Sequence, residues 1–245
     1  MSKELIKDEI DARLFSIENQ DKKSMLLKQR ERLLSLVDVM PRDFYQNTED
    51  ILTNEYFLDT CLNPHHGNQS TFHHSLEVAL ASHIYGTKRY KNVDQVPLNR
   101  GALLHDFYMY SWTEQLPDPL SNIKYDFSKV EWVDVPSPVL DTENSYFANS
   151  HLAIHPHIAL ENSIDIFPQD FGLNSEYEEL NLTEKEKLRV AKMRQIILFH
   201  HGVITLAKPG FFPEEHIGKV FAETKIVRYY DRASTLRLIP PISKI

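Results

Sequence analysis

The sequence contains little glycine and a single cysteine, and each scarcity narrows what the chain can be. Its 7 glycines among 245 residues lie well below the usual share of about 7%. This scarcity disfavours a sheet-rich fold with many tight turns and favours helices. With 1 cysteine, an intramolecular disulfide framework is excluded. Hydrophobic residues at 42% and charged residues at 25% are typical of a globular chain rather than a disordered one.

Long apolar runs and basic runs are also absent. No stretch approaches the roughly 20 apolar residues that a membrane-spanning helix needs, and no run of five or more basic residues occurs. The formal net charge of -8 disfavours an extended nucleic-acid surface, because the overall field repels polyphosphate. Residues 1–9 are largely charged and lack the apolar core of a signal peptide. We therefore expect a cytoplasmic protein without a membrane span.

Apolar residues recur at helical spacing over most of the chain. The N-terminal part predicts one helix from Lys3 to about Gln20 and a second from Lys22 to Met40, which stops before Pro41. This helical hairpin is expected to pack on the rest of the chain or to mediate self-association as a homodimer. Further helices are predicted at about 71–89, 98–108, 156–167, 183–202 and 218–234.

Two local signals refine this all-α prediction. Thr183 and Glu186 form the capping box that starts a helix, and Gly202 is placed to end the same helix. Residues 125–135 instead alternate apolar and polar side chains, which is a strand or hairpin pattern. We expect a small β-like insertion near 113–150 within a helical frame.

The chain has 12 histidines, and they are clustered rather than scattered. His105 and Asp106 end an apolar helix, where an uncompensated carboxylate would be costly. A bound metal ion would compensate it. The alternative is a histidine on the helix dipole beside a solvated aspartate. Four other predicted helices each carry a histidine or carboxylate on or beside an apolar face: His74, His155, His200 and Asp231. A shared metal site explains this set better than separate core or surface histidines do.

The ordered pattern His74, His105-Asp106, His155, His200 and Asp231 resembles the HD-domain superfamily of metal-dependent phosphohydrolases. The likeness covers residues 60–235. Within the superfamily, the chain is similar to a bacterial subgroup without a firmly assigned substrate. The motifs His-Gly-Asn-x-Ser at 66–70 and His-Asp-Phe-x-x-Tyr-x-Trp at 105–112 carry that likeness. It implies an HD-domain helical bundle at 60–235, preceded by an N-terminal helical region at 1–59 and followed by a tail at 236–245.

The resemblance also implies a binuclear metal site. One ion would be held by His74, His105, Asp106 and Asp231, and Asp106 would bridge to a second ion held by His155 and His200. Such nitrogen and carboxylate ligands suit divalent transition metals, with Fe or Mn expected first and Ni, Co or Zn as alternatives. His201 competes with His200 for its role. Asp106 and His105 would then be the catalytic residues, and Cys61 needs no role.

The implied activity is hydrolysis of a small, nucleotide-like phosphate ester by a metal-activated hydroxide. The lysine that many HD enzymes carry after the doublet is missing, so phosphate recognition is assigned to Arg100, His151 and Arg232. His66, His73 and His157 are further candidates for neighbours of the site, whereas His65, His83 and His216 are expected to need no functional account. Two alternatives stay open: an HD-type di-iron oxygenase and a non-enzymatic nucleotide-sensing module.

Overall fold

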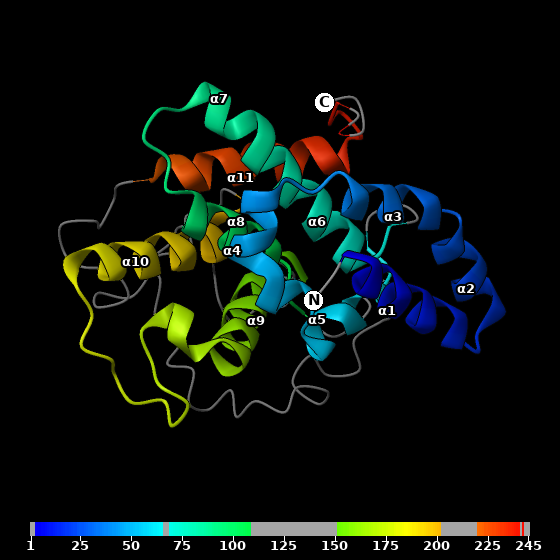
Figure 1. Cartoon of the computed structure of the whole chain (residues 1–245), viewed down its shortest axis with the longest axis horizontal. Coiled ribbons are helices and arrows are strands. Elements are labelled where there is room, and N and C mark those ends of the chain that lie inside the picture. Colours follow the sequence, from blue (N-terminus) through cyan, green and yellow to red (C-terminus); the bar gives the residue numbers. More distant parts are fainter. Residues whose placement is uncertain (1–2, 66–68, 109–150, 202–219, 241, 243–245) are drawn as a thin grey trace, which may run out of the picture.

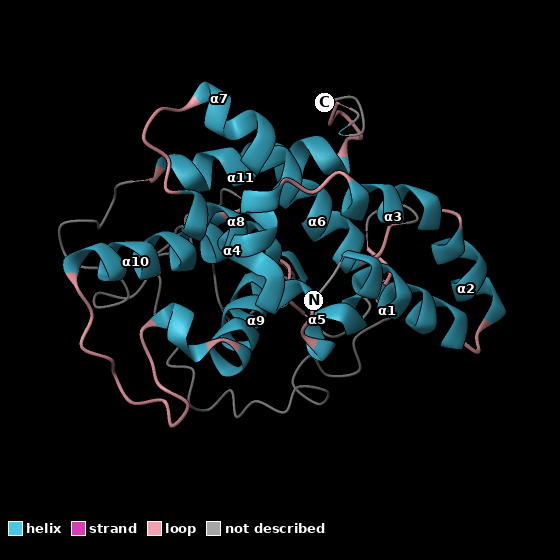
Figure 2. Cartoon of the chain, viewed as in Figure 1, coloured by secondary structure: helices cyan, strands magenta, loops and turns pink. Residues whose placement is uncertain are grey.

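The computed structural model describes residues 3–65, 69–108, 151–201, 220–240 and 242. These residues form helices joined by loops, as Figures 1 and 2 show, and no β-strand occurs among them apart from two isolated bridges. The all-α prediction is therefore confirmed. None of the helices in the described ranges is long and apolar enough to cross a bilayer. The expected β-like insertion at 113–150 and the expected helix end at Gly202 lie outside the described residues.

The N-terminal region contains three helices where two were predicted: α1 (Lys3–Ser16), α2 (Gln20–Leu27) and α3 (Arg30–Asp38). The predicted second helix breaks at residues 28–29, where Gln29 leaves ideal helical geometry with φ −104° and ψ −1°. The turn lets Leu26 on one side and Leu33 on the other both reach the core, where each is 3% exposed. Helical spacing alone did not reveal this change of direction.

Two more helices, α4 (Arg42–Leu52) and α5 (Glu55–Asp59), follow directly. The helix α4 starts immediately after Pro41, whose extended backbone prevents α3 from continuing. Phe44 and Ile51 on its inner face are fully buried, and α4 packs against α8 (Gln95–Leu104). The N-terminal helices share one continuous hydrophobic cluster with the rest of the described chain.

The centre of the molecule consists of α6 (Thr71–Ala81) and α8, with α10 (Glu184–Phe199) and α11 (Ala222–Thr235) packed against them. Every residue of α6 is buried. It continues through one π-helical turn at Ser82–Gly86 into α7 (Thr87–Arg89). The helix α9 (His151–Ile166) begins earlier than predicted and contains Pro156. The short 3₁₀ segments η1 (Thr60–Leu62) and η4 (Pro168–Phe171) connect the helices.

The helices α8 and α10 approach each other closely at a glycine. Gly101 in α8 faces Ile196 in α10, and a Cβ at position 101 would lie 2.9 Å from the Ile196 Cδ1 atom. A side chain here would push the two helices apart. The chain leaves the helices four residues beyond these positions, at His105 and His200, so their tight packing brings those two ends together; the two imidazole rings lie 4.8 Å apart.

The capping box at Thr183 and Glu186 is confirmed. By contrast, α8 begins earlier than predicted, because the Asp94 side chain caps its first turn by accepting from the Val96 amide. The helix also ends earlier than predicted, at Leu104. The chain leaves the helix at the His105-Asp106 doublet itself. Both residues therefore lie just beyond a helix end, where neighbouring side chains can reach a common point.

Candidate metal centre

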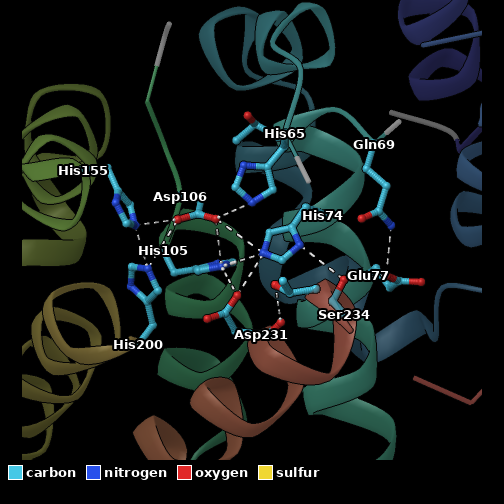
Figure 3. A network of polar contacts seen from close by, with 12 residues as sticks. His65, Gln69, His74, Glu77, His105, Asp106, His155, His200, Asp231 and Ser234 are labelled. Carbon is cyan, nitrogen blue, oxygen red and sulfur yellow. Dashed lines mark hydrogen bonds and ion pairs between the residues drawn. The ribbon is translucent and has the colours of Figure 1, made fainter. Parts of the chain in front are cut away.

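Five segments distant in sequence deliver histidine and aspartate side chains to one buried point (Figure 3). His74 comes from α6, the doublet from the end of α8, and His155 from α9. His200 follows α10, and Asp231 lies in α11. All six of the predicted ligands are at most 3% exposed: His74, His105, Asp106, His155, His200 and Asp231. The structure thus brings together the whole predicted ligand set.

Asp106 is at the middle of the cluster, and its two oxygens face different partners (Figure 3). Oδ2 lies 3.4 Å from His74 Nε2 and 3.3 Å from His105 Nε2. Oδ1 lies 3.2 Å from His155 Nε2 and 3.4 Å from His200 Nε2. This carboxylate therefore divides the cluster into two halves and belongs to both.

Asp231 completes the Oδ2 half. Its Oδ1 lies 3.1 Å from His74 Nε2 and 3.8 Å from His105 Nε2, and the two Nε2 atoms are themselves 3.3 Å apart. In the other half, His155 Nε2 lies 3.0 Å from His200 Nε2 and 2.9 Å from His201 Nε2. Each half is thus a set of at least three donor residues whose ligand atoms lie within 4.8 Å of one another.

The histidine rings are held so that Nε2 faces inward. The Nδ1 of His105 donates to the Ala102 carbonyl at 2.8 Å, and the Nδ1 of His200 donates to the Ile197 carbonyl at 2.7 Å. A carbonyl can only accept, so Nδ1 carries the proton in the neutral ring and Nε2 offers a lone pair. Metal-binding histidines characteristically donate their second nitrogen to such a partner.

His74 is oriented by a longer chain of contacts. The Ser234 hydroxyl donates to Glu77 Oε2 at 2.6 Å, which leaves its oxygen to accept from His74 Nδ1 at 3.2 Å. Glu77 is in turn held by Arg32 and by Gln69 Nε2 at 3.1 Å. Burial alone would raise the pKa of Glu77, but the Ser234 hydroxyl and the Arg32 charge outweigh it and lower the pKa. The carboxylate thus stays charged and orients the ligand through Ser234.

When the rings are neutral, their lone pairs face carboxylate oxygens and one another inside the protein, unless a proton or a cation lies between them. Acceptors that meet without a proton between them repel, and burying them without a counter-charge is costly. A cation removes the conflict. Two ligand atoms of one ion lie about 3.0–3.4 Å apart when metal–ligand bonds are about 2.0–2.1 Å long, and the separations within each half are close to this spacing. The residues present therefore fit a borderline divalent metal with nitrogen and oxygen ligands.

The pKa values show that the Oδ2 half attracts positive charge. Burial alone would lower the pKa of His105, but the carboxylates of Asp106 and Asp231 outweigh it and raise the pKa to about 10. Burial alone would raise the pKa values of Asp106 and Asp231, but the surrounding imidazoles outweigh it and lower both pKa values far below the usual range. In the other half, burial and neighbouring imidazoles lower the pKa of His201 to about 3, so this ring is neutral and able to ligate.

His200 and His201, the two candidates for one ligand role, both lie in the Oδ1 half. His200 is completely buried and fixed by the Ile197 carbonyl. His201 is 24% exposed, yet its Nε2 reaches His155 and its Nδ1 lies 3.7 Å from Asp231 Oδ2. Both belong to the group of donors around Asp106 Oδ1.

The three expected phosphate-binding residues lie in different surroundings. Arg100 is held by Asp50, Asp170 and the Asn47 carbonyl, so it joins α8 to α4 and η4 and is not among the residues of the cluster. Arg232 is exposed, and its guanidinium donates to the His201 carbonyl at 3.4 Å, at the edge of the cluster. His151 is the first residue of α9, and its side chain lies outside the described set.

Among the remaining histidines, His65 is the one that sequence reasoning missed. It was expected to need no functional account, yet it is buried and its Nε2 lies 3.3 Å from Asp106 Oδ2. The available sequence signal was that His65 directly precedes the His-Gly-Asn-x-Ser motif at 66–70. Two other histidines, His66 and His216, lie outside the described residues. His73, His83 and His157 are not members of the donor groups. His83, as expected, has structural partners in Asn99 and Asp43.

Comparisons with protein-family models, with curated proteins and with solved structures returned no significant match to this chain.

Proposed function

We propose that this protein is a metal-dependent phosphohydrolase or phosphodiesterase acting on a small, nucleotide-like phosphate ester. One observation supports the proposal above all. Two sets of buried nitrogen and oxygen donors meet at Asp106, one on each of its oxygens. The resemblance of the ordered motif to HD-domain phosphohydrolases adds the reaction class. Fe or Mn are the metals proposed first, because imidazole and carboxylate ligands suit them.

In this proposal the chain's own residues hold and orient the reacting groups. Ala102 and Ile197 fix two of the imidazoles through their carbonyls, and the Glu77–Ser234 pair fixes His74. The depth of the cluster keeps bulk water from competing for the ligands. A pair of divalent ions held there would polarise a phosphoryl oxygen and lower the pKa of a water molecule.

Substrate recognition in an acidic protein requires a local positive charge. Arg232 is the described candidate, because it is exposed and lies next to Asp231 in α11. A guanidinium suits bidentate phosphate binding. Arg100 is not proposed for this role, since its donors already face Asp50 and Asp170.

The test is turnover by protein loaded with Mn or Fe. Nucleotides, dinucleoside polyphosphates and cyclic dinucleotides are incubated with it, and phosphate or nucleotide products are quantified. Metal-dependent product release that the Asp106→Ala variant lacks is the expected result. Substrate-induced thermal stabilisation without any product would favour a sensing module instead. Oxygen consumption with iron-loaded protein and a polyol or phosphonate would favour the oxygenase.

A further inference from the structure

We infer that His65 is an additional metal ligand on the Oδ2 side of Asp106, and that Tyr108 orients it for this task. The inference rests on the proposed function, in so far as that function requires a metal at Asp106. Neither the ordered motif nor its six expected ligands contain His65. It comes instead from the distances around Asp106 Oδ2.

The backbone explains why His65 reaches the cluster. The segment before α6 folds back on itself, with an antiparallel bridge between Pro64 and Ser70. The His65 amide donates to the Gln69 carbonyl at 2.8 Å, and the Thr71 amide donates to the Asn63 carbonyl at 2.9 Å. These bonds attach His65 to the first turn of α6, the turn that also carries His74. The two imidazole rings are 4.4 Å apart, and the His65 ring points toward Asp106 (Figure 3).

The distance from His65 to Asp106 indicates a ligand rather than a simple ion pair. A charge-assisted hydrogen bond from imidazole to carboxylate is about 2.7–2.9 Å long. His65 Nε2 lies 3.3 Å from Asp106 Oδ2, which is the same distance that separates His105 Nε2 from that oxygen. His74 Nε2 is 3.4 Å away from it. Three imidazole nitrogens thus lie 3.3–3.4 Å from one carboxylate oxygen, and the ligand atoms of His65, His74 and Asp106 lie within 4.8 Å of one another.

Tyr108 provides the orienting contact. Its hydroxyl lies 2.5 Å from His65 Nδ1, the position that a backbone carbonyl occupies beside His105 and His200. The phenol oxygen can accept a hydrogen bond from Nδ1–H, and Nε2 then presents its lone pair toward Asp106. Tyr108 is itself buried and anchored, because Asn63 Nδ2 donates to its carbonyl at 3.3 Å. Its ring also contacts His155 from the other half of the cluster, with ring centroids 5.8 Å apart.

This assignment makes the two halves unequal. The Oδ2 half gains a fifth donor residue, namely His65 beside His74, His105, Asp106 and Asp231, whereas the Oδ1 half has four: Asp106, His155, His200 and His201. If each half held an ion with the same number of ligands, the half with fewer protein donors would leave more positions for water or substrate. The substrate's phosphate group is therefore expected to bind mainly on the His155 side.

The experiment measures manganese binding to purified protein by chelator competition and elemental analysis. His65→Ala is expected to weaken the binding of one of the two ions by more than the roughly 100-fold upper end for loss of an orienting partner, and to leave the binding of the other unchanged. Tyr108→Phe, which removes only an orienting partner, should weaken the binding of the same ion about 10- to 100-fold. His83→Ala is the matched control, since it removes another buried imidazole, and should bind both ions as the wild type does. Asp231→Ala is the positive control and should lose the ion of the Oδ2 half.

Two outcomes would overturn the inference while leaving the proposed function intact. One is wild-type binding of both ions by His65→Ala when Asp231→Ala loses one. The other is wild-type binding by His65→Gln, whose amide can replace a hydrogen bond to Asp106 but replaces an imidazole ligand poorly. Circular dichroism confirms that each variant is folded, and His65→Gln decides the question if His65→Ala is not. Failure of the wild-type protein to bind manganese, iron, cobalt, nickel or zinc would instead contradict the proposed function itself.

Discussion

Within the described part of the chain, the charged cluster around Arg100 and the one around Asp106 are built on opposite principles. Around Arg100, each donor meets an acceptor: Nε lies 2.8 Å from Asp170, and the two terminal nitrogens each lie 2.7 Å from an Asp50 oxygen. Around Asp106, imidazole lone pairs meet carboxylate oxygens and one another. The first cluster is complete within the chain. The second consists of donor atoms that a bound cation would satisfy.

This difference shows that burial and residue type do not by themselves separate a structural cluster from a functional one. Arg100 is buried, as are the residues around Asp106, and both clusters contain aspartates. Residues of both clusters were named from the sequence, Asp231 as a metal ligand and Arg100 as a candidate for phosphate binding. What separates them is the balance of donors and acceptors once the orienting hydrogen bonds have been assigned. Substitutions in and around the two clusters test that separation.

Removal of Asp106 should have the largest effect. The Asp106→Ala variant removes the carboxylate that both halves share, so metal content should fall by one or both ions and turnover should drop below detection. Elemental analysis and product release measure the two effects. Asp50→Ala, which removes a carboxylate from the complete cluster, is the matched control and should keep its metal. A fully loaded and fully active Asp106→Ala protein would show that the site has been assigned wrongly.

Removal of Arg100 should affect stability rather than metal binding. Arg100→Ala leaves the mostly buried Asp170 without its cation, which should lower the free energy of unfolding by about 2–4 kcal/mol. The value is set below the range for fully buried pairs because Asp50 is 58% exposed. Urea denaturation measures the loss. Reduced metal content per folded chain would contradict the structural role of this cluster.

Ser234→Ala should weaken metal binding without removing a ligand. The variant breaks the link between Glu77 and His74, so His74 is less well oriented, and we expect a 10- to 100-fold loss of affinity for the ion on the Oδ2 side. Chelator competition measures it. Ser163→Ala is the matched control, because Ser163 is equally buried but donates only to the Ala159 carbonyl. Equal metal affinities of Ser234→Ala and Ser163→Ala would contradict the orienting role of Ser234.

Glu77→Gln should produce a pH-dependent loss of stability in metal-free protein. The pKa of Glu77 in the folded protein is lowered below its ordinary value of 4.5, so its stabilising contribution is fully present above about pH 4.5 and is lost as the pH falls. The wild type should exceed Glu77→Gln by about 1–2 kcal/mol at pH 7. Denaturation series at several pH values should show this difference shrinking below pH 4.5. A constant difference would mean that the charge of Glu77 does not matter.

His157→Ala should have the smallest effect. His157 lies in α9 two residues beyond His155, yet it is half-buried outside both donor groups. Metal content and turnover should stay at wild-type levels, and stability should change by about 1 kcal/mol or less. If His157→Ala lost as much metal as a ligand variant, His157 would have to belong to the metal site, which contradicts this prediction.

The sequence predicted the helical class and the six candidate ligands that lie together around Asp106, because both predictions depend on local patterns in a fixed order. The capping box at Thr183 was readable for the same reason. The break between α2 and α3 was not, since both sides continue the same helical spacing and only packing chooses the turn. The ion pairs of Arg100 were not predicted, because their carboxylates come from α4 and η4 and no sequence pattern indicated that these segments meet. His65 was missed because its role depends on a loop folding back onto α6.

Crystals of the as-isolated protein, with anomalous scattering and elemental analysis of the same preparation, would reveal whether the cluster around Asp106 holds metal. We expect two transition-metal ions per chain, one on each side of Asp106, with that carboxylate bridging them. A well-ordered cluster without metal, or metal bound elsewhere in the chain, would contradict it.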